Sequence, residues 1–357
     1  MKKIPHNKPS LGNEESIAAS KVIESGWIAQ GHKVGELENN ICEFLNIDNG
    51  HSLVVSSGTS ALFISLKIFD FPIGSEVLIP SYVCSALLNA IYLANLTPVI
   101  IDVNAIDFNF EVSEITSRLS AKTKAVIIPH MYGIPVDMSG FEKLKRDGII
   151  IIEDCATALG SYDSNIHVGM FGDISIFSFY ASKFITCGNG GGIFSKNKVL
   201  IEKARDYREF DCTANYKPRF NFQLTDVQAA VGIVQFSKVN VFLKKRKIFS
   251  DAYSTLCLEK GIEYQKPLKP HLRPNNYRFV LKSNADDTVK LQNFLRKRDI
   301  ETIIPIESYE LLHNYMNLNK SNFQISESIA TTTLSLPIYP ALKDTEFNYI
   351  LETLKAF

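Results

Sequence analysis

The sequence predicts an α/β fold, in which helices cover a mostly parallel sheet and a smaller α+β unit follows. Short apolar runs bounded by turn residues recur through the first two-thirds of the chain. Helical patterns separate several of these runs, which is typical of parallel strands because each needs a crossover connection. The length of 357 residues exceeds one average domain, so we expect a large domain and a smaller one.

The predicted strands of the large domain share a continuous apolar character, as expected for strands buried on both faces. They are residues 52–56, 76–79, 98–102, 125–129, 148–154, 174–179 and 192–195. The helices predicted between them are residues 60–69, 84–94, 138–146 and 199–207.

The last third of the chain has a different pattern. Residues 225–258 predict one long helix or two helices in tandem, because apolar residues gather on one helical face. The elements predicted beyond it are strands 277–281 and 301–304 and helices 288–298, 325–332 and 344–355. We therefore assign residues 1–240, including an N-terminal helical segment, to the large domain and residues 241–357 to the small α+β domain.

Composition and charge exclude several classes of protein. The chain is 45% hydrophobic and 21% charged, which is ordinary for a globular protein. Its 38 basic residues equal its 38 acidic ones, so no charge pattern favours nucleic acid or an anionic membrane surface. Six cysteines without a C-x-x-C pair argue against a zinc site or a disulfide framework. With no apolar run long enough to span a membrane, we expect a cytoplasmic protein without a metal, a nucleic-acid partner or a membrane partner.

Polar residues follow three of the predicted strands, at the sheet edge where α/β proteins bind ligands. In the first, a strand runs through Ser56 and Ser57 into Gly58, Thr59 and Ser60, where a helix begins. Free amides at a helix N-terminus, with a glycine that allows close approach, form a site suited to phosphate. The alternative interpretation is an ordinary serine or threonine N-cap.

The second strand end carries two adjacent carboxylates. Four isoleucines, residues 149–152, mark a buried strand that ends in Glu153 and Asp154. Adjacent strand residues point to opposite faces, so these two are not expected to act as a pair. One carboxylate that faces the ligand could bind a metal, a ribose hydroxyl or a protonated ring nitrogen, and the alternative is a cap for the following turn.

The third strand end carries a lysine. Ser178 ends the strand, Lys183 follows in a loop, and residues 187–192 are rich in glycine. A lone loop lysine is usually a solvated surface residue. Here it accompanies a candidate phosphate site and a strand-end aspartate about thirty residues earlier. An amine, an anion for a ring nitrogen and phosphate donors are what pyridoxal 5′-phosphate (PLP) requires.

Over nearly its whole length the chain resembles the DegT/StrS family of PLP-dependent sugar-nucleotide aminotransferases, which share the fold-type I architecture. Any one matching segment is a weak signal, but many in the family's order are a strong one. The matching segments are residues 24–31 (ESGWIAQG), 57–62 (SGTSAL), 79–82 (IPSY), 98–103 (PVIIDV), 130–133 (HMYG), 153–156 (EDCA), 178–183 (SFYASK), 220–230 (FNFQLTDVQAA) and 334–340 (LSLPIYP).

The resemblance implies a role for each matching residue. Lys183 would carry PLP as a Schiff base, and Asp154 would pair with its ring nitrogen. The phosphate ligands implied within one subunit are Gly58, Thr59, Ser60 and Ser178. The resemblance further implies a homodimer with shared active sites, in which Asn221 reaches the neighbouring subunit's phosphate.

The chain departs from the family pattern at four positions. Thr157 stands where glutamine or histidine usually lies near the phenolic oxygen of PLP. Cys84 stands where an aromatic residue often stacks on the ring, so Tyr82 or a thiol contact would have to serve. Asn189 and Gln223 replace a common glutamate and a frequent arginine. Relatives that dehydrate sugars replace the lysine with histidine, and the presence of Lys183 argues against that activity.

Three further residues have two interpretations each. Arg278 stands where relatives often have histidine, and its planar fork could bind the carboxylate of an amino donor. The alternative is a surface arginine at a strand edge. His130 and His313 match family positions near the ligand, but packed, hydrogen-bonded histidines are the more common case.

The resemblance implies an aminotransferase that moves an amino group from glutamate or glutamine to a keto-sugar, expected to be nucleotide-linked, in surface-polysaccharide or amino-sugar biosynthesis. One alternative is a PLP enzyme acting on a non-nucleotide acceptor, such as a cyclitol or a small phosphorylated ketone. Another is a PLP-binding regulator without turnover, although no helix-turn-helix or basic stripe supports it. A dinucleotide-binding protein is excluded because no G-x-G-x-x-G follows a strand.

Overall fold

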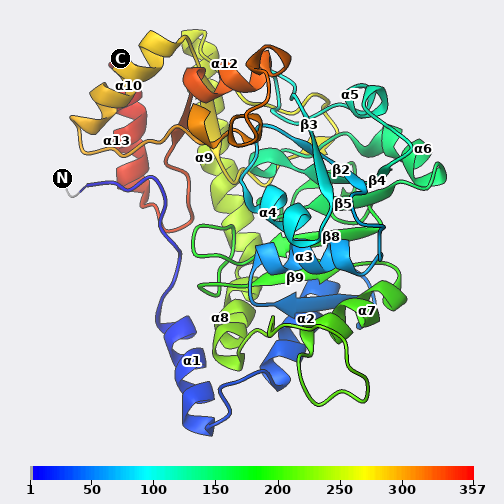
Figure 1. Cartoon of the computed structure of the whole chain (residues 1–357). Coiled ribbons are helices and arrows are strands. Elements are labelled where there is room, and N and C mark those ends of the chain that lie inside the picture. Colours follow the sequence, from blue (N-terminus) through cyan, green and yellow to red (C-terminus); the bar gives the residue numbers. More distant parts are fainter. Residues whose placement is uncertain (1–2) are drawn as a thin grey trace.

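A computed structural model describes residues 3–357 and confirms the predicted α/β fold around a seven-stranded sheet (Figure 1). The strand order across the sheet is β1-β9-β8-β5-β4-β2-β3. The strands are β1 (Ser52–Val55), β2 (Glu76–Pro80), β3 (Thr97–Ile101), β4 (Thr123–Pro129), β5 (Ile150–Asp154), β8 (Ile174–Ser178) and β9 (Gly191–Phe194). All seven predicted strands of the large domain are therefore present.

The sheet is mostly parallel. Strand β2 pairs in parallel with β3 and β4, β4 with β5, and β5 with β8. Strand β9 alone runs the other way, because it pairs antiparallel with both β1 and β8. The parallel strands bring their carboxyl ends to one edge, so the segments after β1, β5 and β8 start from the same edge of the sheet.

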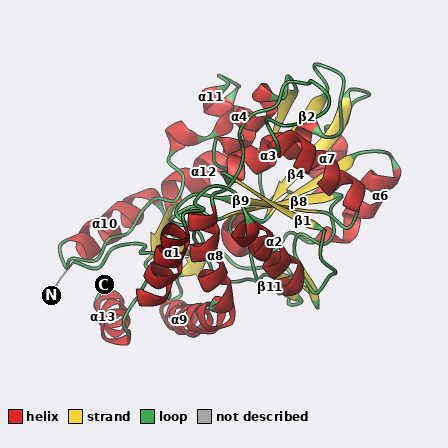
Figure 2. Cartoon of the chain, turned by 90° about the horizontal axis from the view of Figure 1, so that it is seen from below, coloured by secondary structure: helices red, strands yellow, loops and turns green. Residues whose placement is uncertain are grey.

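Helices cover both faces of this sheet (Figure 2). Neighbouring strand residues alternate between the two faces: Ile127 packs in the core beneath α3 (Gly58–Lys67) and α4 (Ala86–Leu93), whereas Val126 packs beneath α5 (Val112–Ser117) and α6 (Phe141–Arg146). The remaining helices of this part are α1 (Asn13–Ser25), α2 (His32–Phe44), α7 (Lys198–Arg208) and α8 (Asp226–Ser237). Double coverage explains why the strands are apolar along their length rather than alternating.

The long helix predicted from residue 225 is two helices in tandem, which was one of the two alternatives. Lys238 separates α8 from α9 (Val239–Lys260). The first turns of α9 pack in the core of the large sheet through Phe242, and its later turns pack in a second core through Phe249. Because α9 contributes to both cores, a boundary at residue 240 falls within its first turn and stays a prediction.

The C-terminal part is an α+β unit built on the second core. Its sheet has the order β10-β12-β13 and both pairings are antiparallel. Its elements are β10 (Glu263–Tyr264), β12 (Phe279–Lys282), α10 (Ala285–Arg296), α11 (Leu312–Tyr315), α12 (Gln324–Thr332), β13 (Thr333–Leu336) and α13 (Asp344–Lys355). A separate small sheet joins β11 (Leu272–Arg273), β6 (Tyr162–Asp163) and β7 (Ile166–His167).

The predicted strand 301–304 is wrong. Ile303 makes only an isolated bridge to Ser335, and Ile300 makes another to Ile4. Ile300, just before the segment, is buried, whereas Ile303 and Ile304 are only partly buried. Two single bridges to different partners do not form a ladder. Strand β13, which the sequence did not predict, pairs with β12 instead.

The N-terminal segment, residues 3–10, begins beside the C-terminal unit and then runs down to α1 (Figure 1). Its Ile4 is buried in the second core and exchanges backbone hydrogen bonds with Asp299 and Glu301, at 2.8 and 2.9 Å. Helix α1 then packs against α8. No helix within residues 3–357 is long and apolar enough to cross a membrane.

Candidate active site

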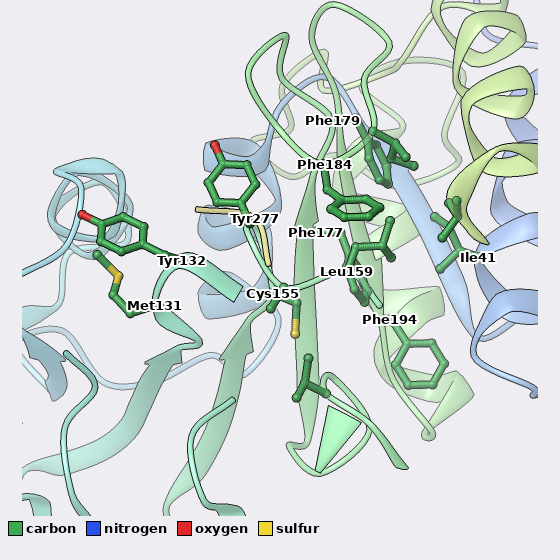
Figure 3. Packing of buried hydrophobic residues seen from close by; sticks show 14 of the residues in the cluster. Ile41, Met131, Tyr132, Cys155, Leu159, Phe177, Phe179, Phe184, Phe194 and Tyr277 are labelled. Atoms are coloured by element: carbon green, nitrogen blue, oxygen red, sulfur yellow. The ribbon is translucent and has the colours of Figure 1, made fainter. Parts of the chain in front are cut away.

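The lysine predicted to carry the cofactor lies in a loop held by buried aromatic residues. Phe179, directly after β8, and Phe184, directly after Lys183, are both buried. Figure 3 shows their rings in the same hydrophobic cluster as Phe177 of β8. The Lys183 amide donates to the carbonyl of Tyr180 at 2.9 Å. The loop is thus anchored on both sides of a lysine whose side chain stays partly exposed.

Two distant residues fix the peptide that precedes this lysine. The carbonyl of Ser182 accepts hydrogen bonds from the Tyr277 hydroxyl at 2.9 Å and from the Asn7 side-chain amide at 3.1 Å. Tyr277 also brings its ring centroid to 6.0 Å from Lys183 Nζ. The N-terminal segment and the segment before β12 therefore both contact the lysine loop.

Asp154, the last residue of β5, has little hydrogen bonding for a buried carboxylate. Its side chain is 6% exposed and accepts from the amide of Ala156 at 2.9 Å. Burial raises the pKa of Asp154, and the positive charge of Lys183 opposes this shift. Since β5 and β8 are paired neighbours, Asp154 and the lysine loop start from the same edge of the sheet. An incompletely bonded carboxylate near an amine fits a cofactor that presents a protonated ring nitrogen.

Glu153, its neighbour in the strand, is fully saturated. It is 0% exposed and accepts from His130 Nε2 at 3.1 Å and from the amides of Gly169, Phe171 and Gly172 at 2.7, 2.7 and 2.5 Å. Burial would raise the pKa of Glu153, but the hydrogen bond from His130 and the backbone amides lower it overall. This carboxylate holds together the loop before β8 and has no free lone pair directed to a ligand.

The predicted phosphate site lies where α3 begins. The Ser57 hydroxyl caps the helix by accepting from the Ser60 amide at 3.0 Å, so the N-cap interpretation is correct, and the phosphate site stays a prediction. The amides of Gly58 and Thr59 have no acceptor among the hydrogen bonds of residues 3–357. A Cβ at Gly58 would lie 3.1 Å from Ser178 Oγ. The start of α3 and the end of β8 thus meet closely, and their amides and hydroxyls fit an anion.

Cys84 is exposed to solvent, whereas Tyr82 is buried. Tyr82 is fully buried, its ring packs edge-on against Phe108, and its hydroxyl accepts from that of Tyr132 at 3.3 Å. Burial raises the pKa of Tyr82 to about 12. Cys84 is solvent-exposed, although surrounding protein raises the pKa of its thiol and Lys183 opposes that shift. Of the two residues predicted to contact the ring, Tyr82 is therefore buried inside the protein and Cys84 is the exposed one.

The side chains of Thr157 and Asn221 both make hydrogen bonds within the chain. The Thr157 hydroxyl donates to the carbonyl of His130 at 3.1 Å, so it is not a free donor for a phenolic oxygen. Asn221 is exposed, and its side-chain oxygen accepts from the amide of Gln223 at 3.1 Å. Gln223 in turn donates to Glu209 at 2.7 Å. A single chain cannot bring Asn221 to a neighbouring subunit, and that role stays a prediction.

The two histidines are packed side chains. His130 Nδ1 accepts from the amide of Val136 at 3.0 Å, which leaves Nε2 to donate to Glu153. His313 stacks on Phe323 with ring centroids 4.3 Å apart and hydrogen-bonds Ser81 at 2.6 Å. Both arrangements agree with the more common interpretation of these residues.

Three residues that contact the lysine loop or Arg278 were not predicted from the sequence: His6, Asn7 and Tyr277. No local signal marks His6 or Asn7, because their partners lie far away along the chain. Tyr277 was assigned to a predicted strand, yet it precedes β12 and uses its hydroxyl on the lysine loop. Only pairing between distant segments could have identified this group.

Known proteins resemble this chain over nearly its whole length. The model of the DegT/DnrJ/EryC1/StrS aminotransferase family matches residues 9–355. The chain is 29% identical to a GDP-perosamine synthase of Escherichia coli O157:H7, covering 100% of this chain and 99% of the relative, and 27% identical to one of Vibrio cholerae, covering 99% of each. The aminotransferase TlmJ from Streptoalloteichus hindustanus has a similar structure, with a TM-score of 0.90, 26% identity and coverage of 99% and 98% of the two chains.

Proposed function

Because the chain belongs to the DegT/DnrJ/EryC1/StrS aminotransferase family and is therefore a PLP-dependent aminotransferase, we propose that it aminates a nucleotide-linked keto-sugar, with glutamate or glutamine as donor. The GDP-perosamine synthases, which match it end to end, support this acceptor class. A role in surface-polysaccharide or amino-sugar biosynthesis follows from the same likeness.

We propose that PLP is held between the ends of β1, β5 and β8. When bound, the cofactor withdraws electrons from the donor's Cα and carries the amino group between the two substrates. Lys183 would attach it covalently and, once displaced by the donor, would move a proton at that Cα. Asp154 would keep the ring nitrogen protonated. The residues proposed for its phosphate are Gly58, Thr59, Ser60 and Ser178.

Three predictions from the sequence are modified or stay open in this proposal: the residue that contacts the ring, the role of Thr157 and the shared homodimer site. Cys84, and not Tyr82, is proposed to face the ring, and Thr157 is proposed to contact the cofactor only as a hydrogen-bond acceptor. We further propose a cytoplasmic homodimer in which Asn221 supplies a phosphate contact to the partner. Sedimentation of the holoenzyme should give the mass of two chains, and mixing Asn221→Ala with Lys183→Ala subunits tests whether sites are shared.

Asp154 ends β5 and the lysine loop follows β8, and these two strands are parallel neighbours in the sheet; this shared edge is the observation that supports the proposal. The test is an assay of amino transfer with glutamate and glutamine to a panel of acceptors. We expect turnover with nucleotide-linked keto-sugars and ping-pong kinetics. Turnover confined to free cyclitol ketones or small phosphorylated ketones would replace the proposed acceptor with a non-nucleotide one.

A further inference from the structure

Three cationic side chains surround the ring of Tyr277. Lys183 Nζ lies 6.0 Å from its centroid, Arg246 Cζ 5.7 Å and Arg278 Cζ 5.6 Å. Burial alone would raise the pKa of Tyr277, but these three charges lower it overall. The lysine loop therefore lies in a strongly positive region. Of the three cations, only Lys183 has a role in the proposed chemistry.

Arg246 is accounted for as a structural residue. It is 2% exposed, and its Nη1 donates to the carbonyls of Asn276, Tyr277 and Ile338 at 3.3, 2.8 and 2.7 Å. These bonds connect α9 with the segment before β12 and with the chain after β13. Its positive charge, however, has no carboxylate partner within residues 3–357, so it adds to the field around Tyr277 without being neutralised.

Arg278 is the member of the group with unused donors. Its guanidinium lies over the ring of Tyr132, with Cζ 5.3 Å from the centroid, as well as near Tyr277. The hydrogen bond that it makes within residues 3–357 is a long one, from Nη1 to His6 Nε2 at 3.4 Å. Its Nε is buried without an acceptor. A guanidinium flanked by two aromatic rings and lacking a carboxylate is an incomplete ion pair.

The N-terminal segment holds this arginine in place. His6 Nε2 also lies 2.9 Å from the Ser335 hydroxyl of β13. Burial and then the charges of Arg278 and Arg246 lower the pKa of His6 to about 3. The imidazole is thus neutral at physiological pH, and the single lone pair of Nε2 is shared between the Ser335 hydroxyl and the Arg278 guanidinium. The next residue, Asn7, donates to the carbonyl of Ser182, so one short segment contacts both Arg278 and the lysine loop.

We propose that Arg278 binds the α-carboxylate of the amino donor, with His6 as its positioning residue. This inference rests on the proposed transamination, because it assigns the donor's place in that reaction. The fork of the guanidinium offers two parallel N–H groups to one carboxylate. The rings of Tyr132 and Tyr277, with centroids 5.3 and 5.6 Å from Cζ, restrict this side chain before the donor arrives, so less side-chain freedom is lost on binding.

The location favours the donor's carboxylate over the acceptor's phosphates. In an amino acid, the carboxylate and the reacting nitrogen share one carbon, so a donor whose nitrogen is at Lys183 must place its carboxylate nearby. In a nucleotide-linked sugar, the phosphates are separated from the reacting carbonyl carbon by bonds of the sugar ring. Arg278 and Lys183 both lie near one aromatic ring, which suits the smaller separation.

The experiment separates the two half-reactions of the dialysed holoenzyme. Loss of PLP absorbance on mixing with L-glutamate reports the donor half, and amination of the keto-sugar by the aminated enzyme reports the acceptor half. In Arg278→Gln we expect the glutamate concentration for half-maximal rate to rise by a factor on the order of 100. Isothermal titration should show a similar loss of affinity for 2-oxoglutarate, whereas the acceptor half-reaction should change less than about twofold.

Two further variants keep the test decisive if Arg278→Gln is unstable. Arg278→Lys retains the charge without the fork and should recover part of the glutamate affinity. His6→Ala should weaken glutamate binding by roughly fivefold, because the arginine loses its orientation but not its charge. Arg273→Gln, a change of an exposed arginine on the same chain segment, is the matched control and should leave both half-reactions unchanged.

The outcomes distinguish this inference from the proposed function. A defect confined to the keto-sugar half-reaction would assign Arg278 to the acceptor's phosphates, and equal defects in both halves would make it a structural residue. Either result overturns the inference. If the wild-type enzyme loses its PLP absorbance with glutamate in an Arg278-dependent way but aminates no nucleotide-linked sugar, the donor site stands and the proposed acceptor is wrong.

Discussion

Glu153 and Asp154 are adjacent carboxylates at the end of one strand, and the fold treats them in opposite ways. Glu153 accepts from His130 and three backbone amides and has its pKa lowered, while Asp154 accepts from one amide and has its pKa raised by burial. The alternation of strand side chains separates them onto opposite faces. A buried carboxylate that has all its donors stabilises a loop, and one that lacks them is available to a ligand.

This comparison depends on what lies beneath each face. On the Glu153 side, the chain between Gly169 and Gly172 turns its amides inward, and a Cβ at Gly172 would lie 2.8 Å from the Ile151 carbonyl. On the Asp154 side lies the loop of Lys183, whose side chain is partly exposed. Sequence position alone cannot distinguish Glu153 from Asp154, but the hydrogen-bond donors around each carboxylate do.

The largest effect on activity should come from removing the amine of Lys183, on the Asp154 side. Lys183→Ala should lower amino transfer by about 10⁴-fold, because both covalent attachment and proton transfer are lost. Purified protein should also lack the absorbance of covalently bound PLP. Lys196→Ala removes an exposed lysine just after β9 and serves as the control. Turnover of Lys183→Ala within tenfold of the wild type would disprove the assignment.

Asp154→Asn should separate activity from stability. We expect turnover to fall by a factor on the order of 10² to 10³, because the ring nitrogen loses its anionic partner. The raised pKa of Asp154 means that its ionised form opposes folding at neutral pH, and that this penalty fades as the pH falls through the folded-state pKa. The thermal midpoint of the apoprotein should therefore stay equal or rise. A large fall in that midpoint would show that Asp154 is structural.

Glu153→Gln should lower the stability of the protein, whereas Asp154→Asn should lower its activity. The amide places an N–H₂ group among four donors, and we expect a loss of about 2–4 kcal/mol in unfolding free energy. Because the pKa of Glu153 lies below its ordinary 4.5, its contribution is present above that value and disappears as the pH falls through the folded-state pKa. Urea unfolding at neutral and acidic pH measures this. Equal stability of variant and wild type at neutral pH would contradict the account.

The smallest effect concerns the proposed phosphate site. A Cβ in Gly58→Ala would lie 3.0 Å from Ser178 Cβ and 3.1 Å from its Oγ, so the start of α3 and the end of β8 must move apart. We expect PLP affinity to fall by about tenfold. Gly35→Ala in α2 meets nothing within 4 Å and should leave affinity unchanged. Titration of the apoprotein with PLP, followed by absorbance, compares the two, and equal affinities would place the phosphate elsewhere.

Local sequence was sufficient for most of the large domain. Continuous apolar strands such as 149–152 could be predicted because a doubly covered sheet imposes that pattern on each strand separately. The small unit was harder, because whether residues 301–304 form a strand depends on which distant segment pairs with them. In the structure, Ile300 makes a single bridge to Ile4 of the N-terminal segment, and β13 pairs with β12.

The site divides in the same way. Lys183, Asp154 and the start of α3 carry signals at strand ends, so they could be proposed from the sequence. The burial of Tyr82 against Phe108 and the contact of Asn7 with the lysine loop result from packing between segments far apart in the chain. Single-sequence patterns contain no information on such packing.

The claim that Asp154, and not Glu153, serves the cofactor can be tested most directly at the ring nitrogen itself. Apoprotein reconstituted with ¹⁵N-labelled PLP should give the nitrogen resonance of a protonated pyridine ring in the wild type and in Glu153→Gln. In Asp154→Asn the resonance should move to the position of an unprotonated ring. A protonated ring that persists in Asp154→Asn, or one that is lost in Glu153→Gln, would contradict the account.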